Sequence, residues 1–267
     1  MTVLSTRTVE KPWGRDRLPA PFVAPEGTRI GEIWFEPPET LDQLLVKYIF
    51  TSEKLSIQNH PSDAQTEAKG QGRQGKEECW YVIDAEPGAA LGIGFSEDVD
   101  ADTMRAAAED GSIEDMLVWH AVRAGDFFYI PANTVHAIGA GVSLIEVQQN
   151  SDITYRLYDY GRPRELHLDE GIAVATGTPH DPHLRFHVPA RGTQRLVEGP
   201  FFVLDRLDGQ PDAELRAQYT GPLLVIPREG SVTVDGEEVA PGGCALAHGI
   251  DAVRFADDGL CLVTRPC

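Results

Sequence analysis

The sequence predicts a mainly β protein, arranged as a sandwich or barrel. Short runs rich in Val, Ile, Tyr and Phe are separated by Gly, Pro and Asp, a composition typical of strands joined by tight turns. Short strands at this spacing favour a sandwich or a barrel. The predicted strands cover residues 44–50, 55–60, 79–83, 126–130, 142–148, 153–158, 201–207, 222–227, 231–234, 252–256 and 260–264.

The main exception is a helical insertion at residues 98–119. Asp102 precedes the segment MRAAAED, and Ser112 precedes IEDMLVW with Asp115 three residues later, a pattern close to a capping box. We therefore predict two short surface helices in this insertion, and we expect them to cover the mouth of the site described below.

A linker is predicted between two units. Residues 177–192 lose strand periodicity and gain Pro and Gly, which places a boundary near residue 185. The predicted units are 1–184, a catalytic and metal-binding domain, and 185–267, a smaller all-β domain without a metal site. Within the second unit, Asp235-Gly236 lies between two short strand-like runs and predicts a tight hairpin.

Charge and composition exclude several classes of partner. The 267 residues include 42 acidic and 23 basic side chains, a formal charge of −19 that repels nucleic-acid phosphates and anionic lipids. The first twenty residues lack an apolar run of signal-peptide length, and no apolar run is long enough to span a bilayer. We expect a cytoplasmic protein that binds neither nucleic acid nor membrane. The four widely spaced cysteines are expected to be reduced.

Three segments contain candidate metal ligands. In LSIQNHP, alternation along a strand places Gln58 and His60 on one polar face. In GKEECWY, the adjacent acids Glu77 and Glu78 point to opposite sides, so only one of them can be a ligand. In GDFFYIPANTVH, a turn and a strand deliver His136 beyond a tight corner.

The third segment matches in outline the second motif of the cupins, β-barrels that bind a metal on inward-facing strands. His60, Glu78 and His136 therefore predict one bound divalent cation. An additional amide oxygen favours zinc over soft copper, and manganese, cobalt or iron could substitute. The general cupin motif has His-x-His, whereas here Gln58 takes the place of the first His. In the C-terminal unit, PGGCALAH is similar to GDFFYIP, which favours a degenerate second cupin-like module.

This variant of the motif resembles the type I phosphomannose isomerases in their short bacterial form, a zinc-dependent family of the cupin superfamily. The resemblance covers residues 10–170 and rests on KPWG, GEIW, LSIQNHPSD, GKEECWY, GDFFYIPANTVHAIGAG and IEVQQNSDITYRLYDYGRPRELH. It implies an aldose-ketose isomerase that interconverts mannose 6-phosphate and fructose 6-phosphate. In such a reaction a proton moves between C1 and C2 through an enediolate.

Carried over residue by residue, the resemblance implies one zinc ion per chain. It assigns the zinc ligands to Gln58, His60, Glu78 and His136. It assigns active-site roles to Arg156, Lys76 and Glu146.

A phosphorylated substrate requires a local cationic or polar site, because the net charge of the protein repels anions. Ser56 lies on the same strand face as the first predicted ligands and is the first candidate for the phosphate. Lys54 is the second, and Arg162 and Arg164 are further candidates. The aromatic residues that could border the sugar are predicted to be mostly core: Trp13, Trp34, Trp80 and Tyr81.

Two other functions remain open for the same fold. The first is a metal-dependent cupin dioxygenase, although open iron sites usually prefer His-rich ligation. The second is a non-catalytic sugar-phosphate-binding cupin, which would not need Lys76, Glu146 and Arg156 together. The sequence also leaves open whether the protein is a monomer or a homodimer.

Overall fold

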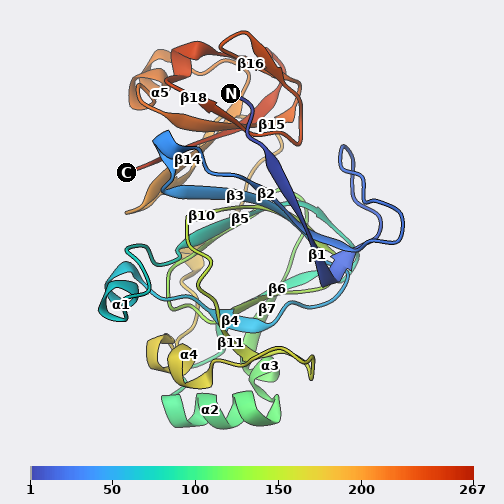
Figure 1. Cartoon of the computed structure of the whole chain (residues 1–267), viewed down its shortest axis with the longest axis vertical. Helices are drawn as coiled ribbons and strands as arrows, with labels where there is room; N and C mark the ends of the chain where they lie inside the picture. Colours follow the sequence, from blue (N-terminus) through green and yellow to red (C-terminus); the bar gives the residue numbers. More distant parts are fainter. Residues whose placement is uncertain (1) are drawn as a thin grey trace.

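Two antiparallel sheets face each other in the N-terminal part of the chain (Figure 1). The computed structural model of the protein describes residues 2–267. The larger sheet has the strand order β1 (Thr6–Arg15), β2 (Ile30–Phe35), β3 (Leu44–Phe50), β10 (Val142–Gln149), β5 (Glu78–Ala85), β8 (Asp126–Ile130) and β12 (Arg185–His187). The smaller sheet has the order β11 (Tyr155–Tyr158), β4 (Ile57–Asn59), β9 (His136–Ile138), β6 (Ala90–Phe95) and β7 (Leu117–Ala121). The mainly β, cupin-like prediction is confirmed.

Strand β3 lies inside the larger sheet and is buried on both faces. Val46 and Tyr48 belong to the apolar cluster on the outer face, next to the C-terminal unit, whereas Ile49 packs in the gap between the two sheets. Burial on both faces explains why the sequence of β3 is apolar almost throughout. Lys47 is the exception, and it faces the gap.

Strand β10 divides the gap between the sheets into an apolar part and a polar part. Its inward positions run Val142, Leu144, Glu146 and Gln148, and all four are buried. The first two pack in an apolar cluster with side chains of both sheets. The polar end of the strand therefore determines where a site can form.

Short helices pack outside the sheets. They are α1 (Asp63–Ala68), α2 (Ala101–Asp110), α3 (Ile113–Met116), α4 (Leu168–Val174) and α5 (Ala213–Gln218), with single 3₁₀ turns η1 (Glu39–Leu41), η2 (Pro182–Leu184) and η3 (Ile250–Ala252). Among residues 2–267, none of these helices is both long and apolar enough to span a membrane.

The predicted insertion at 98–119 does form two helices, α2 and α3, with strand β7 directly after them. The N-cap of α2 is Asp100, whose carboxylate accepts a hydrogen bond from the backbone N of Thr103 at 2.8 Å, so the cap is two residues earlier than predicted. Met104 and Ala107 of α2 pack with Ile57 and Leu157. These helices therefore cover the outer face of the smaller sheet, and the expectation that they cover the site is wrong (Figure 1).

The C-terminal unit contains two further antiparallel sheets. One has the order β13 (Gln194–Glu198), β14 (Phe202–Asp208), β20 (Leu260–Pro266), β15 (Leu223–Glu229) and β18 (Ala245–Ala247), and the other has β17 (Glu237–Val239), β16 (Val232–Val234) and β19 (Val253–Arg254). Strands β16 and β17 form the predicted hairpin. Its turn residues, Asp235 and Gly236, have φ values of 49° and 86°, the left-handed conformation that such turns require.

The two units meet through an apolar interface. One cluster of buried side chains combines Tyr48 and Phe127 of the larger sheet with Phe202, Leu224 and Leu262 of the C-terminal unit. Strand β12 pairs with β8, so residues 185–187 extend the larger sheet. We propose that the chain forms two domains. Because β12 belongs to the larger sheet, the chain passes from the first domain to the second between β12 and β13.

Candidate metal centre

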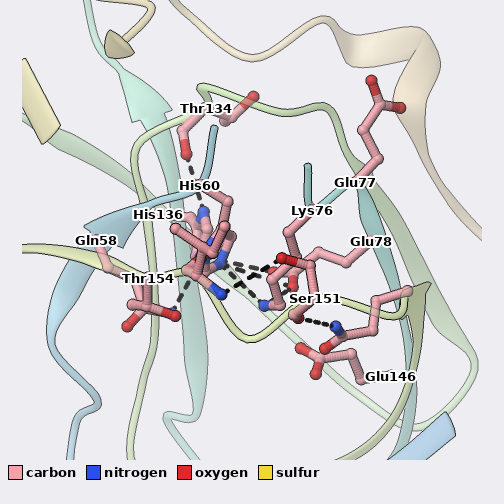
Figure 2. Close-up of polar contacts among 12 residues, drawn as sticks. Gln58, His60, Lys76, Glu77, Glu78, Thr134, His136, Glu146, Ser151 and Thr154 are labelled. Carbon is pink, nitrogen blue, oxygen red and sulfur yellow. Dashed lines mark hydrogen bonds and ion pairs between the residues drawn. The ribbon is translucent and has the colours of Figure 1, made fainter. Parts of the chain in front are cut away.

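Three predicted ligands meet in the polar part of the gap between the sheets (Figure 2). His60 follows β4, Glu78 begins β5 and His136 begins β9. One ligand atom from each of the three lies within 4.8 Å of the other two, and all three residues are buried. The carboxylate of Glu78 lies 3.7 Å from Nε2 of His60 and 3.5 Å from Nε2 of His136. The sheets thus bring together segments that are far apart in the sequence.

Both histidines present the same nitrogen to this centre. Nδ1 of His60 is 2.8 Å from the carbonyl oxygen of Ile153, and Nδ1 of His136 is 2.9 Å from that of Thr134. A carbonyl accepts the Nδ1 proton, which leaves Nε2 with a free lone pair. Burial and the nearby Lys76 lower the pKa of His136 to about 3, and the same two causes lower the pKa of His60 well below its usual value. The imidazoles are therefore neutral, the form that binds metals.

Glu78 completes a donor set that fits a divalent cation. Its Oε1 is buried and has no hydrogen-bond partner among residues 2–267. Burial raises the pKa of Glu78 to about 7, although Lys76 acts in the opposite direction. An unpartnered buried carboxylate oxygen is costly, and a bound cation would remove that cost. The fit of these residues to zinc or a similar ion is therefore good.

Lys76 places a positive charge beside this group. Its ammonium is 3.0 Å from Nε2 of His60 and forms an ion pair with Oε2 of Glu78. Burial by itself would lower the pKa of Lys76, but Glu78 and Glu146 outweigh it and the pKa lies above its usual value. Glu77, by contrast, points away from this group in Figure 2 and accepts a hydrogen bond from Tyr129 on the opposite side of β5.

Gln58 lies next to the three ligands. Its Nε2 is 3.5 Å from Nε2 of His136, and its Oε1 accepts a hydrogen bond from Ser56 at 3.0 Å. Rotation of the amide by half a turn exchanges the two ends and would turn Oε1 toward the centre. The predicted fourth ligand is thus within reach of the site, on the strand face that the sequence indicated.

A cavity of about 330 Å³ opens over the metal centre. Ser56, Lys76, Glu146 and Arg156 line it, as predicted. Trp13, Trp34 and Trp80 line it too. Trp13 and Trp80 are also buried in the apolar cluster between the sheets, so the prediction that most of the aromatic residues are core is confirmed. Further lining residues that the sequence analysis did not assign to the site are Lys11, Glu32 and Lys47.

Lys47 is the clearest residue that the sequence analysis missed. Its ammonium is 2.9 Å from Oε2 of Glu146 and 2.6 Å from Oε1 of Gln148. Trp80 donates to Oε1 of Glu146 at 3.1 Å. Burial opposes ionisation of Glu146, but Lys47 and Lys76 lower its pKa to about 2. The sequence did contain a sign of its role, because Lys47 is a single charged residue in an otherwise apolar strand.

A cationic wall borders the other side of the cavity. Arg156 donates to the carbonyl oxygen of Glu165 at 2.7 Å, and its buried Nε has no partner among residues 2–267. Burial and Arg164 lower the pKa of Arg156 from its usual value. Arg164 also lines the cavity and donates twice to the buried carboxylate of Asp159, with both distances 2.6 Å. Asp159 also binds Arg162, at 2.7 Å.

The structure does not bring Lys54 into this cavity. Its ammonium pairs with Glu114 of α3 and lies 5.2 Å from the ring centroid of Trp119. Arg162 is not a lining residue either, because its guanidinium binds Asp159 and the carbonyl oxygen of Lys54. Of the cationic candidates for the phosphate, Arg164 is therefore the one that faces the cavity.

Comparison with known proteins finds relatives that carry the same enzyme name. No protein-family model matches the chain. The chain is 35% identical over 262 residues to a mannose-6-phosphate isomerase of Bacillus subtilis, covering 90% of this chain and 82% of the relative. It is 36% identical over 220 residues to the mannose-6-phosphate isomerase of Streptococcus mutans, covering 78% and 68%. A crystal structure of the mannose 6-phosphate isomerase from Bacillus subtilis has the same fold, with a TM-score of 0.78 over 99% of each chain at 23% identity.

Proposed function

The chain belongs to the mannose-6-phosphate isomerase family, and on that basis we propose that it interconverts mannose 6-phosphate and fructose 6-phosphate in a metal-dependent reaction. The observation that carries the proposal is the buried group of His60, Glu78 and His136 at the base of a cavity with cationic walls. A sugar phosphate is the expected substrate, and the cytoplasm is the expected location.

We propose that one zinc ion per chain is held by His60, Glu78 and His136, with the amide oxygen of Gln58 as the fourth ligand. Two neutral imidazoles, one carboxylate and one amide suit zinc, and other divalent metals could substitute. A bound zinc ion supplies Lewis-acid polarisation of the sugar's carbonyl group.

Cations of the chain stabilise the negative charge that develops on the two reacting oxygens. Arg156 is half-buried, lines the cavity and has a free Nε, so it supplies a fixed positive charge at the reacting centre. Lys47 lies on the opposite wall, held by Glu146 and Gln148. Glu146 keeps a low pKa, so its role is to hold Lys47 and Trp80 in place as an ionised carboxylate.

Lys76 is the residue best placed to move a proton. While it pairs with Glu78, its pKa lies above the usual value and its Nζ keeps the proton. A cation held by Glu78 would remove part of this stabilisation and would lower the pKa of Lys76 toward the range needed for proton transfer. We propose that Nζ of Lys76 exchanges a proton with the substrate.

The phosphate is proposed to lie between Ser56 and Arg164. Both line the cavity, and a guanidinium provides the planar pair of donors that a phosphate accepts. Asp159 holds Arg164 in a fixed orientation and offsets the repulsion among Arg156, Arg162 and Arg164. It is a positioning residue, because its buried carboxylate binds Arg162 and Arg164 and is not among the residues that line the cavity.

An isotope experiment tests the reaction directly. Mannose 6-phosphate is incubated with the metal-loaded protein in heavy water, and the product is analysed by NMR. We expect fructose 6-phosphate with deuterium at C1, no oxygen consumption, and loss of activity on chelation of the metal. Oxygen uptake would support a dioxygenase instead, and binding without turnover would support a sugar-phosphate-binding module.

A further inference from the structure

A second cavity, of about 240 Å³, lies at the junction of the two units, on the opposite face of the larger sheet from the metal centre. The larger sheet contributes Tyr81 and Ile83, which are on the outer face of β5. The segment after β12 contributes Val188, and the C-terminal sheet contributes Arg206 and Arg228. None of the residues that line this cavity lines the one over the metal centre.

Arg206 is a buried cation without a counter-ion. It is only 1% exposed, and it forms no ion pair with a carboxylate in the part of the chain from residue 2 to 267. Its two terminal nitrogens donate to the backbone carbonyls of Pro189 and Gly192, while its buried Nε has no partner. Carbonyl oxygens satisfy some of its donors but do not neutralise its charge, and a buried unpaired charge is costly.

Arg228 is a second guanidinium at the same place; it lies near the hydroxyl of Tyr48 but forms no ion pair with a carboxylate among residues 2–267. Strands β14 and β15 flank β20, where Leu262 lies opposite both Arg206 and Ile226. The side chain of Ile226 therefore shares a face of the sheet with that of Arg206. Strand β15 has a bulge between Pro227 and Glu229, and at this bulge Arg228 lines the same cavity as Arg206. Arg228 is partly buried, and its Nε has no hydrogen-bond partner within residues 2–267.

The carboxylate and the imidazole that line the cavity have partners outside its lining. Glu229, the carboxylate among the lining residues, forms an ion pair with Arg191 at 3.6 Å. His187, also at the rim, is 2.8 Å from a carboxylate oxygen of Asp126. Two guanidinium groups are therefore left with no anion, in a protein whose formal net charge is −19.

We propose that the junction cavity binds a small phosphate-bearing anion between Arg206 and Arg228. Guanidinium groups bind phosphate through pairs of parallel, charge-assisted hydrogen bonds, and the volume of the cavity is sufficient for a phosphate group. Because Arg206 also holds the carbonyls of residues 189 and 192, such an anion would tie the segment between the units to the C-terminal sheet. The site is independent of the proposed isomerase reaction.

Titration with inorganic phosphate tests this site. The background is the full metal-loaded chain with Arg164→Met, which removes the phosphate donor of the metal cavity. Onto it we add either Arg228→Met or, as a matched control, Arg254→Met, an exposed arginine elsewhere in the C-terminal unit. We expect calorimetry to give a phosphate affinity that is weaker by about tenfold or more with Arg228→Met, and unchanged with Arg254→Met.

Two results would overturn the proposal: no phosphate binding to the Arg164→Met background, or equal affinities of the two double variants. Circular dichroism checks that each variant is folded. If Arg228→Met does not fold, Arg228→Lys takes its place, since it keeps the charge but lacks the planar fork. Weaker phosphate binding by the lysine variant than by the control supports the site, and equal binding refutes it.

Discussion

The N-terminal sheets and the C-terminal unit are built on the same principle but use their inward strand positions differently. In the C-terminal unit, the positions between the sheets are filled by apolar side chains such as Val225, Val234 and Val263. In the N-terminal part, the corresponding gap contains Lys47 and Glu146 in addition to the three candidate ligands. Because the two parts share their mainly β architecture, a few inward positions distinguish the part that contains the candidate site from the part that does not.

Two buried carboxylates, one in each part, differ in their partners. In the C-terminal unit, Asp205 accepts from Arg195 at 2.7 Å and from Tyr219 at 2.8 Å, so both of its oxygens are occupied. In the metal centre, Oε1 of Glu78 has no partner among residues 2–267. A satisfied buried group stabilises the fold, whereas an unsatisfied one is available for a ligand.

The largest effect that we predict follows from removing a metal ligand. His136→Ala, and also Glu78→Gln, should abolish both metal binding and isomerase activity, because each removes one donor of a buried set. Metal content by mass spectrometry and a coupled activity assay check this. Glu77→Gln is the matched control, because its side chain faces the other side of β5 and bonds to Tyr129. Equal damage by the control would contradict the assigned strand register.

Removing Arg156 should separate catalysis from metal binding. Arg156→Ala should keep its zinc while kcat falls by a factor of about 10² to 10³, the usual result of losing one preorganised donor at a developing charge. KM should change little, and Arg156→Lys should restore only part of the rate, because an ammonium lacks the planar fork. Loss of zinc would make the residue structural. A normal kcat with a large rise in KM would make it a binding residue.

A smaller effect, mainly on KM, is expected when Asp159 is replaced. Asp159→Asn removes the charge that holds Arg164, so KM for mannose 6-phosphate should rise about tenfold while kcat changes little. The matched control is Asp169→Asn, which affects an exposed pair with Arg105. A merely structural role would be excluded by unchanged thermal stability together with the rise in KM. A fall in kcat with constant KM would contradict the positioning role.

The smallest effect on activity is expected in the C-terminal unit. Tyr219→Phe removes the hydroxyl that donates to Asp205, and should reduce the free energy of unfolding by about 1–3 kcal/mol. Denaturant unfolding measures this change, and kcat and KM should remain those of the unaltered chain. An altered kcat would show that the bond between Tyr219 and Asp205 influences the site in the other unit.

The elements that the sequence predicted well are those buried on both faces. Strands β3 and β8 have the predicted bounds, because burial on two sides makes their sequences almost continuously apolar. Strands β1 and β6 were not predicted. Five of the ten residues of β1 are exposed, which is typical of a loop, and β6 contains two glycines that weaken a strand pattern.

The site, like the fold, has features that the sequence predicts and features that it does not. Strand alternation predicted the shared face of Gln58 and His60 and the outward direction of Glu77, because these depend only on local geometry. The position of Arg164 depends on a buried contact with Asp159, and that of Lys54 on an ion pair with Glu114. Contacts of this kind are made by folding, and a sequence pattern does not show them.

The apolar cluster shared by the two units has a consequence for how the protein unfolds. Tyr48 and Phe50 of the larger sheet have no access to solvent while the C-terminal unit is in place. Deleting that unit would expose a broad apolar face, with the hazard of aggregation. We therefore expect the whole chain to melt in a single cooperative transition. The candidate metal centre would then depend for its integrity on a unit that supplies none of its candidate ligands.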